Sequence, residues 1–408
     1  MGRGRRRNLL LAGGATAAVV LAGYDLWVWL SSFLSDNFHN DFTFYFAAAR
    51  LGLDHGWVHL YDLKLQQAEL DAIHSNITVA QLARFVSPPP LAWIVIPFTL
   101  LPYQAAYWAW SALLVAAMVL AWWIAAPGRD RVRLVFLAAA IGWLPVVYGL
   151  QLGQPALLVA AGVAVSCALL WRRQDWAAGA VLAVLVLKPQ LALLVPVALL
   201  VAGRWRAFAA AAIAIGIVAV ASVIALGPSG VAAYEGILNF ATTVPQNQSQ
   251  TLAAWLPSLP AARAVQALVA LWTLALAYRM RDRGPQTVIA IALAGGLAAS
   301  PYVHYDDLTM LGLAMLLFMR GPCPRGTYAC AAALFIAAEG FPVWGAGPVL
   351  AGELLALVLL SVAALEHRDG VAEHHESEGE HDPDLERDGD DVPADRQGEL
   401  IDHGRGPA

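Results

Sequence analysis

Charged residues are scarce in this chain. They make up 13% of its 408 residues, while 59% are hydrophobic, whereas an ordinary soluble domain is about 25% charged. A soluble protein of this size with so little charge would expose large apolar patches. The composition therefore excludes a soluble globular protein and predicts an all-α, polytopic membrane protein.

Cysteine is also rare, with three residues in the whole chain. Cys167 and Cys330 stand in apolar runs, which excludes a secreted scaffold held together by disulfides. The formal net charge of −5 gives no support for nucleic-acid binding. We expect no cofactor and no metal ion in the membrane domain.

The last segment, residues 366–408, has almost no large apolar side chain. It holds 15 acidic residues, four arginines and five of the ten histidines. Such a composition cannot bury enough apolar surface to offset the entropy of ordering, so the segment is predicted to be a disordered, cytoplasmic tail. A solvated tail and a metal-binding tail both remain open.

Long apolar runs over 9–365 predict a bundle of about 10–12 membrane helices. The first run, 9–30, follows a basic N-terminus (1–8) and is interpreted as a retained signal anchor. By the positive-inside rule, the arginine-rich connections are cytoplasmic and the remaining polar connections face outside. The arginine-rich connections are 129–133, 172–173, 204–206, 279–283 and 320–325, and the outer ones are 31–87, 153–155, 227–262, 300–307 and 341–347.

Two apolar segments conflict with simple alternation across the membrane. Residues 88–102, bounded by prolines, are interpreted as a short element that does not cross. Residues 177–202 lie between two basic connections and are divided at Lys188-Pro189 into halves too short to span. A re-entrant pair of half-helices fits this segment, because non-helical backbone at membrane depth is tolerated beside protein or water. One long tilted span is the alternative.

The first outer segment, 31–87, is longer and more polar than a connector needs. Within it, Asn40 or Asp41 is placed to begin a helix. Asp41 therefore has two interpretations, as a helix cap or as a partly desolvated carboxylate that acts as a general base toward an alcohol.

Lys188 is the one lysine inside an apolar segment. Two interpretations are open for it: it binds a lipid phosphate, or it forms a structural ion pair.

The order of several short motifs is more specific than any one of them. Asp41-Phe-x-x-Tyr45-x-Ala-Ala is followed by Gly56-x-x-x-Leu-Tyr-Asp62 and by the Pro-Pro-Pro-Leu motif at 88–91. Gly-Gln at 153–154, Lys-Pro-Gln at 188–190, Asn-Gln-Ser at 247–249 and Ser-Pro-x-x-x-Tyr-Asp at 300–306 come next. This series resembles glycosyltransferase family 87 (DUF2029), whose members are similar to GT-C glycosyltransferases, including mannosyl- and arabinofuranosyltransferases.

The resemblance implies a function. It implies an inverting transfer of a sugar, mannose or arabinofuranose-like, from a polyprenyl-phosphate donor to a lipid or glycan acceptor. The implied place is the extracytoplasmic face of a bacterial plasma membrane. The family's first-loop aspartate maps onto Asp41 and its lysine onto Lys188. Its late motif often has Trp and His, whereas this chain lacks the Trp and offers only His304.

The residues expected at the site fall into three groups. Asp41 is the expected catalytic base; Lys188, Arg84 and His304 are expected to bind the donor phosphate. The residues expected to bind the remaining substrate are Tyr45, Gln154, Gln190, Asn247, Gln248, Tyr305 and Asp306. A transporter or flippase for a lipid-linked or small solute is the main alternative function, since broken helices and an intramembrane lysine also suit transporters. A non-catalytic membrane scaffold is another.

Overall fold

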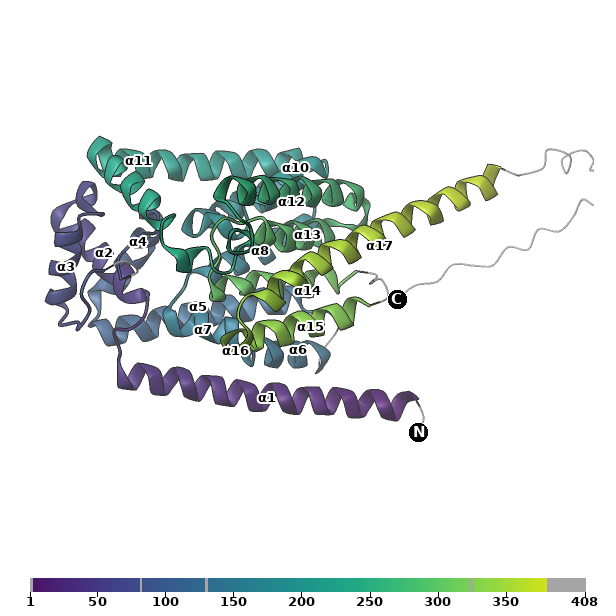
Figure 1. The fold of residues 1–408 in the computed structure, drawn as a ribbon, viewed down its shortest axis with the longest axis horizontal. Coiled ribbons are helices and arrows are strands. Elements are labelled where there is room, and N and C mark those ends of the chain that lie inside the picture. Colours follow the sequence, from purple (N-terminus) through teal and green to yellow (C-terminus); the bar gives the residue numbers. More distant parts are fainter. Residues whose placement is uncertain (1–2, 81–82, 129–130, 322, 324–325, 380–408) are drawn as a thin grey trace, which may run out of the picture. The chain divides into compact units, whose positions relative to one another are not determined.

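The computed structural model describes residues 3–80, 83–128, 131–321, 323 and 326–379. The chain divides into two units, Met1–Ala364 and Leu365–Ala408, and the fold below is that of the first. Throughout the described residues the regular elements are helices, with no strand (Figure 1). The predicted all-α class is therefore confirmed.

The elements follow one another with short connections. The first group is α1 (Arg3–Ser35), α2 (Phe42–His55), η1 (Trp57–His59), α3 (Leu63–Ala72), α4 (Pro89–Val95), η2 (Ile96–Leu100), α5 (Tyr103–Ala125), α6 (Arg131–Ile141), α7 (Leu144–Leu152) and α8 (Ala156–Trp171). The second group is α9 (Asp175–Val181), η3 (Leu182–Leu187), η4 (Pro189–Leu191), α10 (Leu194–Val201), α11 (Trp205–Ala241), η5 (Pro245–Asn247), η6 (Leu252–Trp255) and α12 (Leu259–Arg279). The third is η7 (Arg281–Arg283), α13 (Pro285–Ala298), η8 (Tyr305–Leu308), α14 (Thr309–Phe318), α15 (Thr327–Glu339), α16 (Phe341–Trp344) and α17 (Gly347–Gly379).

The apolar helices of the described residues differ in length. Five are long and apolar enough to cross a membrane, and the bent pair α6–α7, which turns by 56°, makes a sixth if it is one span. The five are Ala12–Ser35, Tyr103–Ala125, Trp205–Ala241, Leu259–Arg279 and Gly347–Ala364. Five shorter apolar helices of 10–17 residues accompany them. The chain is thus a multi-pass helical membrane protein in which several apolar runs are broken.

The segment 175–204 enters the bundle and returns. Arg204, at its end, forms an ion pair of 3.2 Å (Nη1 to Oδ1) with Asp175, at its start, and the rings of Trp176 and Trp205 lie 6.1 Å apart. The backbone breaks at Lys188, whose φ of −155° and ψ of 74° end the helical run. With about 1.5–2 Å of rise per residue, Lys188 lies about 20 Å from the paired ends. This geometry agrees with the predicted re-entrant pair and not with one long tilted span.

The proline-bounded segment is also short. α4 begins at Pro89 and continues into η2, which ends at Leu100, and α5 begins at Tyr103. Seven α-helical and five 3₁₀ residues extend about 20 Å, less than the roughly 30 Å of a hydrocarbon core. The length agrees with the prediction of an element that does not cross.

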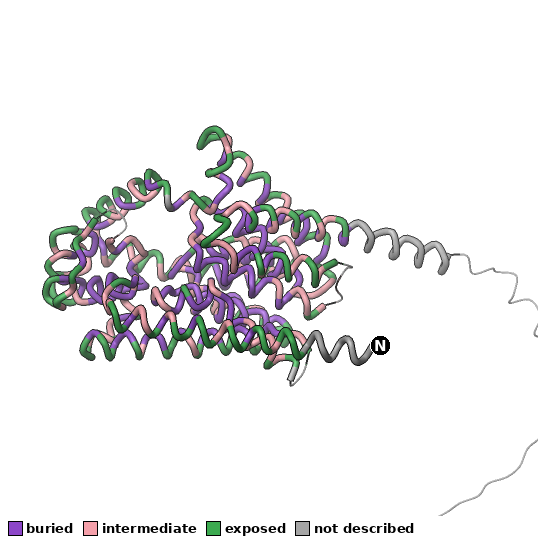
Figure 2. Tube along the Cα trace, turned by 60° about the horizontal axis from the view of Figure 1, so that its bottom comes forward, coloured by how far each residue is buried: buried purple, intermediate pink, exposed green. Residues whose placement is uncertain are grey.

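The core is built around α5, α8, α13 and α14. Among its largest fully buried side chains are Trp110, Trp122 and Trp143. Buried residues occupy the inner sides of the helices, whereas outward sides are exposed (Figure 2). The exposed sides of α1 and α11 are apolar, with residues such as Trp27 and Ile224, as expected for surfaces that face lipid.

The two ends of the bundle differ in chemistry. α2, α3 and α4 lie together at one end (Figure 1), and Tyr103 at the start of α5 contacts Asn40 there. At the opposite end of α5, Arg133 lies 4.5 Å from the ring of Trp123, and Arg320 lies 4.4 Å from that of Trp171. Arginines therefore gather about 30 Å from the polar end.

The predicted tail begins as a continuation of the last helix. Residues 366–379, predicted to be disordered, continue helix α17 to Gly379. Extending an existing helix is far easier than nucleating a new one, and the apolar start of α17 provides the nucleus. Residues 380–408 lie outside the described residues.

Candidate active site

Asp41 stands directly before α2, but it does not cap that helix. The amide of Thr43 donates to Asn40 Oδ1 over 3.1 Å, and the Asp41 side chain makes no cap hydrogen bond. The backbone N–H of Asp41 donates to Leu152 O over 2.9 Å, which ties α2 to the end of α7. Because Asn40 supplies the cap, the Asp41 carboxylate is left for another role.

Gly153 brings α7 and α2 together at this point. Its φ of +72° is left-handed, and a Cβ atom there would lie 2.8 Å from Cβ of Phe42. Trp110 Nε1 donates to Gly153 O over 2.8 Å. Only glycine satisfies both the conformation and the close approach, and the result is that Gln154 stands beside Asp41 and donates through Nε2 to Asp41 Oδ2.

Lys188, at the tip of the re-entrant segment, reaches into the same place. Its Nζ donates to Asp306 Oδ2 over 2.7 Å and to Gln154 Oε1 over 3.1 Å, and it also pairs with Asp307 Oδ1. Lys188 is 8% exposed and both aspartates are fully buried. The ion-pair reading of Lys188 is thus realised in the structure.

His304 faces a different partner. Its backbone N–H donates to Asp307 Oδ2 over 2.8 Å, and its Nε2 lies 3.0 Å from Asn247 Oδ1. Asn247 Nδ2 donates to Ala241 O over 2.8 Å, so Asn247 Oδ1 accepts and His304 Nε2 carries the proton. Burial lowers the pKa of His304 to about 4, which leaves its imidazole neutral at pH 7.

The environment of Asp41 weakens its acidity. Burial raises the pKa of the Asp41 carboxyl to about 6, and the negative charge of Asp306 acts in the same direction. Lys188 and the hydrogen bond from Gln154 oppose this shift. A carboxylate with a pKa of about 6 is a better proton acceptor than an exposed aspartate, yet it is mostly ionised at pH 7.

The structure joins most of the predicted site residues in one network. Tyr45 donates through its hydroxyl to Gln154 Oε1 over 3.2 Å. The joined residues are Asp41, Tyr45, Gln154, Lys188, Asp306 and, through Asp307, His304 and Asn247.

Other predicted residues lie outside this network. Tyr305 donates to Ala338 O over 2.7 Å and stacks on Phe341. Gln248 donates to Thr242 O over 2.6 Å within its own loop. Gln190 is half-buried two residues beyond Lys188. Arg84 lies 4.5 Å from the ring of Phe240 on α11.

Two residues of the site were not predicted. Asp307 completes the pairing of Lys188, and the ring of Tyr302 lies 4.6 Å from that of His304. Both belong to the 300–307 motif, and the Asp306-Asp307 pair at the start of an apolar run was the available signal.

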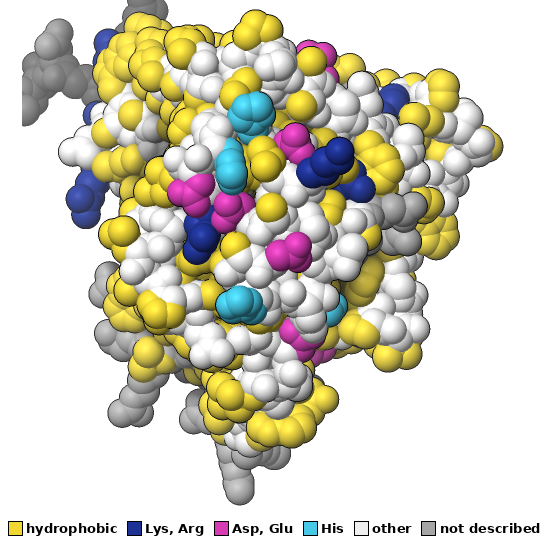
Figure 3. Space-filling model, turned by 90° about the vertical axis from the view of Figure 1, so that its left-hand side faces the viewer, with side chains coloured by type: hydrophobic (Ala, Val, Ile, Leu, Met, Phe, Trp, Pro, Cys, Tyr) yellow, Lys and Arg dark blue, Asp and Glu magenta, His cyan; other side chains and the backbone are white. Residues whose placement is uncertain are grey.

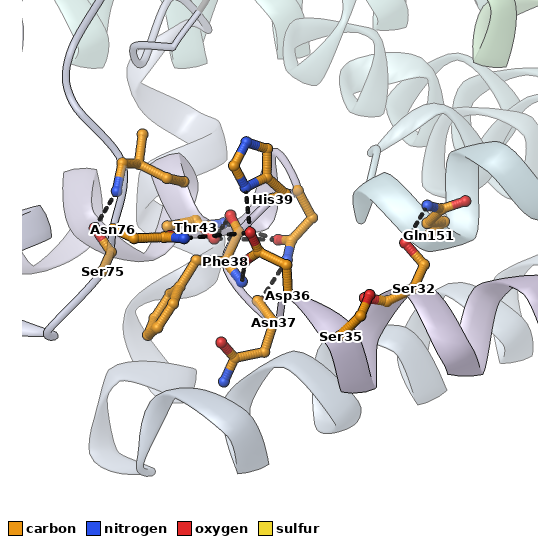
Figure 4. Close-up of polar contacts among 12 residues, drawn as sticks. Ser32, Ser35, Asp36, Asn37, Phe38, His39, Thr43, Ser75, Asn76 and Gln151 are labelled. Carbon is orange, nitrogen blue, oxygen red and sulfur yellow. Dashed lines mark hydrogen bonds and ion pairs between the residues drawn. The ribbon is translucent and has the colours of Figure 1, made fainter.

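A second polar cluster lies on the exposed surface of the connection between α1 and α2, which also contains Asp41. Asp36 Oδ2 accepts from His39 Nδ1 at 2.6 Å and from Asn76 at 3.3 Å, so that His39 and Asn76 converge on one carboxylate (Figure 4). Figure 3 shows acidic, basic and histidine side chains gathered on this end of the molecule. The cluster fastens the loop after α3 to the end of α1.

An apolar groove begins beside the re-entrant tip. It has a volume of about 320 Å³ and lies between α4, η3 and α11. Its lining includes Pro89, Pro189, Leu193, Val223 and Tyr234, and Leu193 and Val223 are 60% and 57% exposed. Lys188 in the network and Pro189 in the groove are adjacent residues, so the two features meet at the tip.

Fold and site together define a multi-pass membrane protein with a buried network of carboxylates and one ammonium, set at the opposite end of the bundle from Arg133 and Arg320. No group of three or more His, Cys, Asp or Glu that could hold a metal ion occurs in the described part of the chain. The sequence model of glycosyltransferase family 87 matches residues 85–301, just over half of the chain. The chain belongs to this family and is a membrane glycosyltransferase. No curated protein and no solved structure matches it.

Proposed function

We propose that this glycosyltransferase transfers a sugar from a polyprenyl-phosphate donor to a hydroxyl of a lipid or glycan acceptor, with inversion at the anomeric carbon. Asp41 is the general base. The observation that carries the proposal is the Asp41 carboxylate, which does not cap its helix and lies in a network that adjoins an apolar groove.

The chemistry balances with this chain's own residues. The acceptor oxygen attacks the anomeric carbon while the bond from that carbon to the phosphate oxygen breaks. The proton of the acceptor hydroxyl passes to Asp41, and the polyprenyl phosphate leaves with its negative charge delocalised. A base positioned for such a transfer contributes about 10²–10⁴-fold to the rate.

The groove fits the isoprenoid part of the donor. Its walls are apolar and it opens between exposed side chains of α11 and η4–α10. Phe85, the neighbour of Arg84, packs edge-on against Tyr45 at 6.3 Å between ring centroids, and Tyr61 stacks on the groove residue Tyr234 at 4.7 Å. The Arg84 guanidinium lies 4.5 Å from the ring of Phe240 on α11, the helix that also lines the groove, and we assign the donor phosphate to it.

Of the other network residues, His304 and Asn247, which face each other, are assigned to the sugar and acceptor. The neutral His304 has an unprotonated Nδ1, so it suits a sugar hydroxyl better than a phosphate. Mannose or an arabinofuranose-like sugar is the proposed cargo. The positive-inside rule favours a cytoplasmic location for the arginines at the opposite end. On that basis the proposed topology has both chain ends in the cytoplasm and the site on the extracytoplasmic face of a bacterial plasma membrane.

The test is transfer by purified protein in detergent with a panel of polyprenyl-phosphate sugars and, separately, the matching nucleotide sugars. We expect transfer from one lipid-linked donor and none from nucleotide sugars. Val223→Trp, in the groove wall, should raise the donor KM, whereas Ile224→Trp, which is exposed but outside the groove lining, should not. Transfer from a nucleotide sugar alone, or movement of a solute across vesicles without transfer, would contradict the proposal.

A further inference from the structure

Gln154 occupies an unusual place between the ammonium and the base. Its Oε1 accepts from Lys188 Nζ at 3.1 Å and from Tyr45 at 3.2 Å. An amide oxygen with two donors fixes the orientation of the whole amide group, so that Nε2 must face the Asp41 carboxylate. Gln154 is 4% exposed, and each side of its amide group faces protein.

We infer that Gln154 is a positioning residue and not a substrate ligand. Its amide group orients the Asp41 carboxylate, and Lys188 polarises that amide so that it is a stronger donor to Asp41. This inference rests on the proposed role of Asp41 as the base. Nε2 holds Oδ2, which leaves Oδ1 as the oxygen that takes the acceptor's proton.

The relay extends beyond Gln154. Lys188 is itself held by Asp306 and Asp307, and Asp307 accepts from the backbone of His304. A donor polarised by a cation gives a stronger hydrogen bond in a low-dielectric site than it does alone. The left-handed backbone of Gly153 sets the position from which the Gln154 side chain reaches Asp41. The hydrogen bonds from Asp306 through Lys188 and Gln154 to Asp41 are therefore held by backbone of defined conformation.

Removing the amide should move the acidic side of the pH–rate profile. A hydrogen bond to the ionised form favours that form, and bonds to charged groups are strong enough to shift a titration by about one to two pH units when they are lost. In Gln154→Met, the pH at which kcat is half-maximal should rise by that amount. Activity at pH 7 should fall about 2- to 10-fold and recover toward the wild-type value near pH 9. The donor KM should stay unchanged.

The matched control is Gln151→Met. Gln151 lies three residues earlier and donates to Ser32 Oγ over 2.8 Å instead of entering the network, so its variant should keep the wild-type pH profile. Gln154→Glu is a second variant of the same shape. It retains a partner for Lys188 but places a carboxyl group against Asp41. The pH at which kcat is half-maximal should therefore rise at least as far as it does in Gln154→Met.

The outcomes separate cleanly. Two results, in either Gln154 variant that folds, would overturn the inference. One is a loss of kcat that is equal at every pH. The other is a raised KM for donor or acceptor together with an unchanged pH–rate profile. Loss of activity in Asp41→Asn together with an unmoved profile in the Gln154 variants would refute only this inference. Substantial activity in Asp41→Asn would instead refute the proposed function.

Discussion

Replacement of Lys188 by methionine separates the two roles that an intramembrane lysine can have. In the structure the ammonium lies between the carboxylates of Asp306, at 2.7 Å, and Asp307, and both aspartates are fully buried. Lys188→Met therefore leaves two buried carboxyl groups without their cation. Breaking a buried ion pair by removing one partner costs about 3–5 kcal/mol.

Such a loss should be measurable as a lower unfolding temperature. At about 2–4 °C per kcal/mol for a large domain, the expected decrease in Tm is of order 10 °C. Tryptophan fluorescence of the purified protein in detergent would follow the transition. Adding Asp306→Asn and Asp307→Asn to Lys188→Met removes the stranded charges and should restore much of the Tm, although not the activity.

The donor KM distinguishes the alternative. If Lys188 binds the donor phosphate, Lys188→Met should raise the donor KM strongly and leave the Tm unchanged, and that result would refute the ion-pair reasoning. Lys188→Arg keeps the positive charge while changing the shape of the side chain. It therefore separates the effect of the lost charge on the Tm from the effect of altered packing.

Three further predictions concern pH, the backbone and the tail. With the pKa of Asp41 at about 6, its carboxyl is protonated below that pH, so kcat should fall about tenfold per pH unit there and level off above pH 7; a profile flat down to pH 4.5 would contradict this. Gly153→Ala should lower both Tm and kcat because its Cβ would meet Phe42, whereas Gly203→Ala, with a similar φ of +83° but open space, should cost only about 1 kcal/mol of backbone strain. Ending the chain after His367 should leave Tm and transfer nearly unchanged, because residues 1–364 form one unit, and an inactive truncated protein would show that the tail is needed.

The sequence predicted the parts of the fold that local chemistry decides. Apolar composition gave the all-α membrane class, and the Lys188-Pro189 pair marked a break because proline removes a backbone donor and the lysine needs polar company. The Gly-Gln motif stood at a helix junction. Each of these features depends on a few neighbouring residues.

The pairing of distant segments was beyond sequence reasoning. Lys188 meets Asp306 across 118 residues of chain, and nothing in either neighbourhood names the other. Asn40 and Asp41 were equal candidates for the helix cap until the structure showed Asn40 Oδ1 accepting from Thr43. The bend between α6 and α7 was not anticipated either, since a continuous apolar run conceals such a break. The outer segment predicted to begin at residue 227 instead starts as helix, because α11 continues past a kink at Gly227-Pro228 to Ala241.

The most direct test of the central claim is the transfer rate of Asp41→Asn. Asparagine keeps the size of the side chain and can still accept from Gln154, but it cannot take the acceptor's proton. We predict a loss of about 10²–10⁴-fold in kcat with an unchanged Tm, while Asp36→Asn, in the cluster with His39 and Asn76, stays close to the wild type. If Asp41→Asn keeps most of its activity, Asp41 is not the base, and the proposed mechanism is wrong.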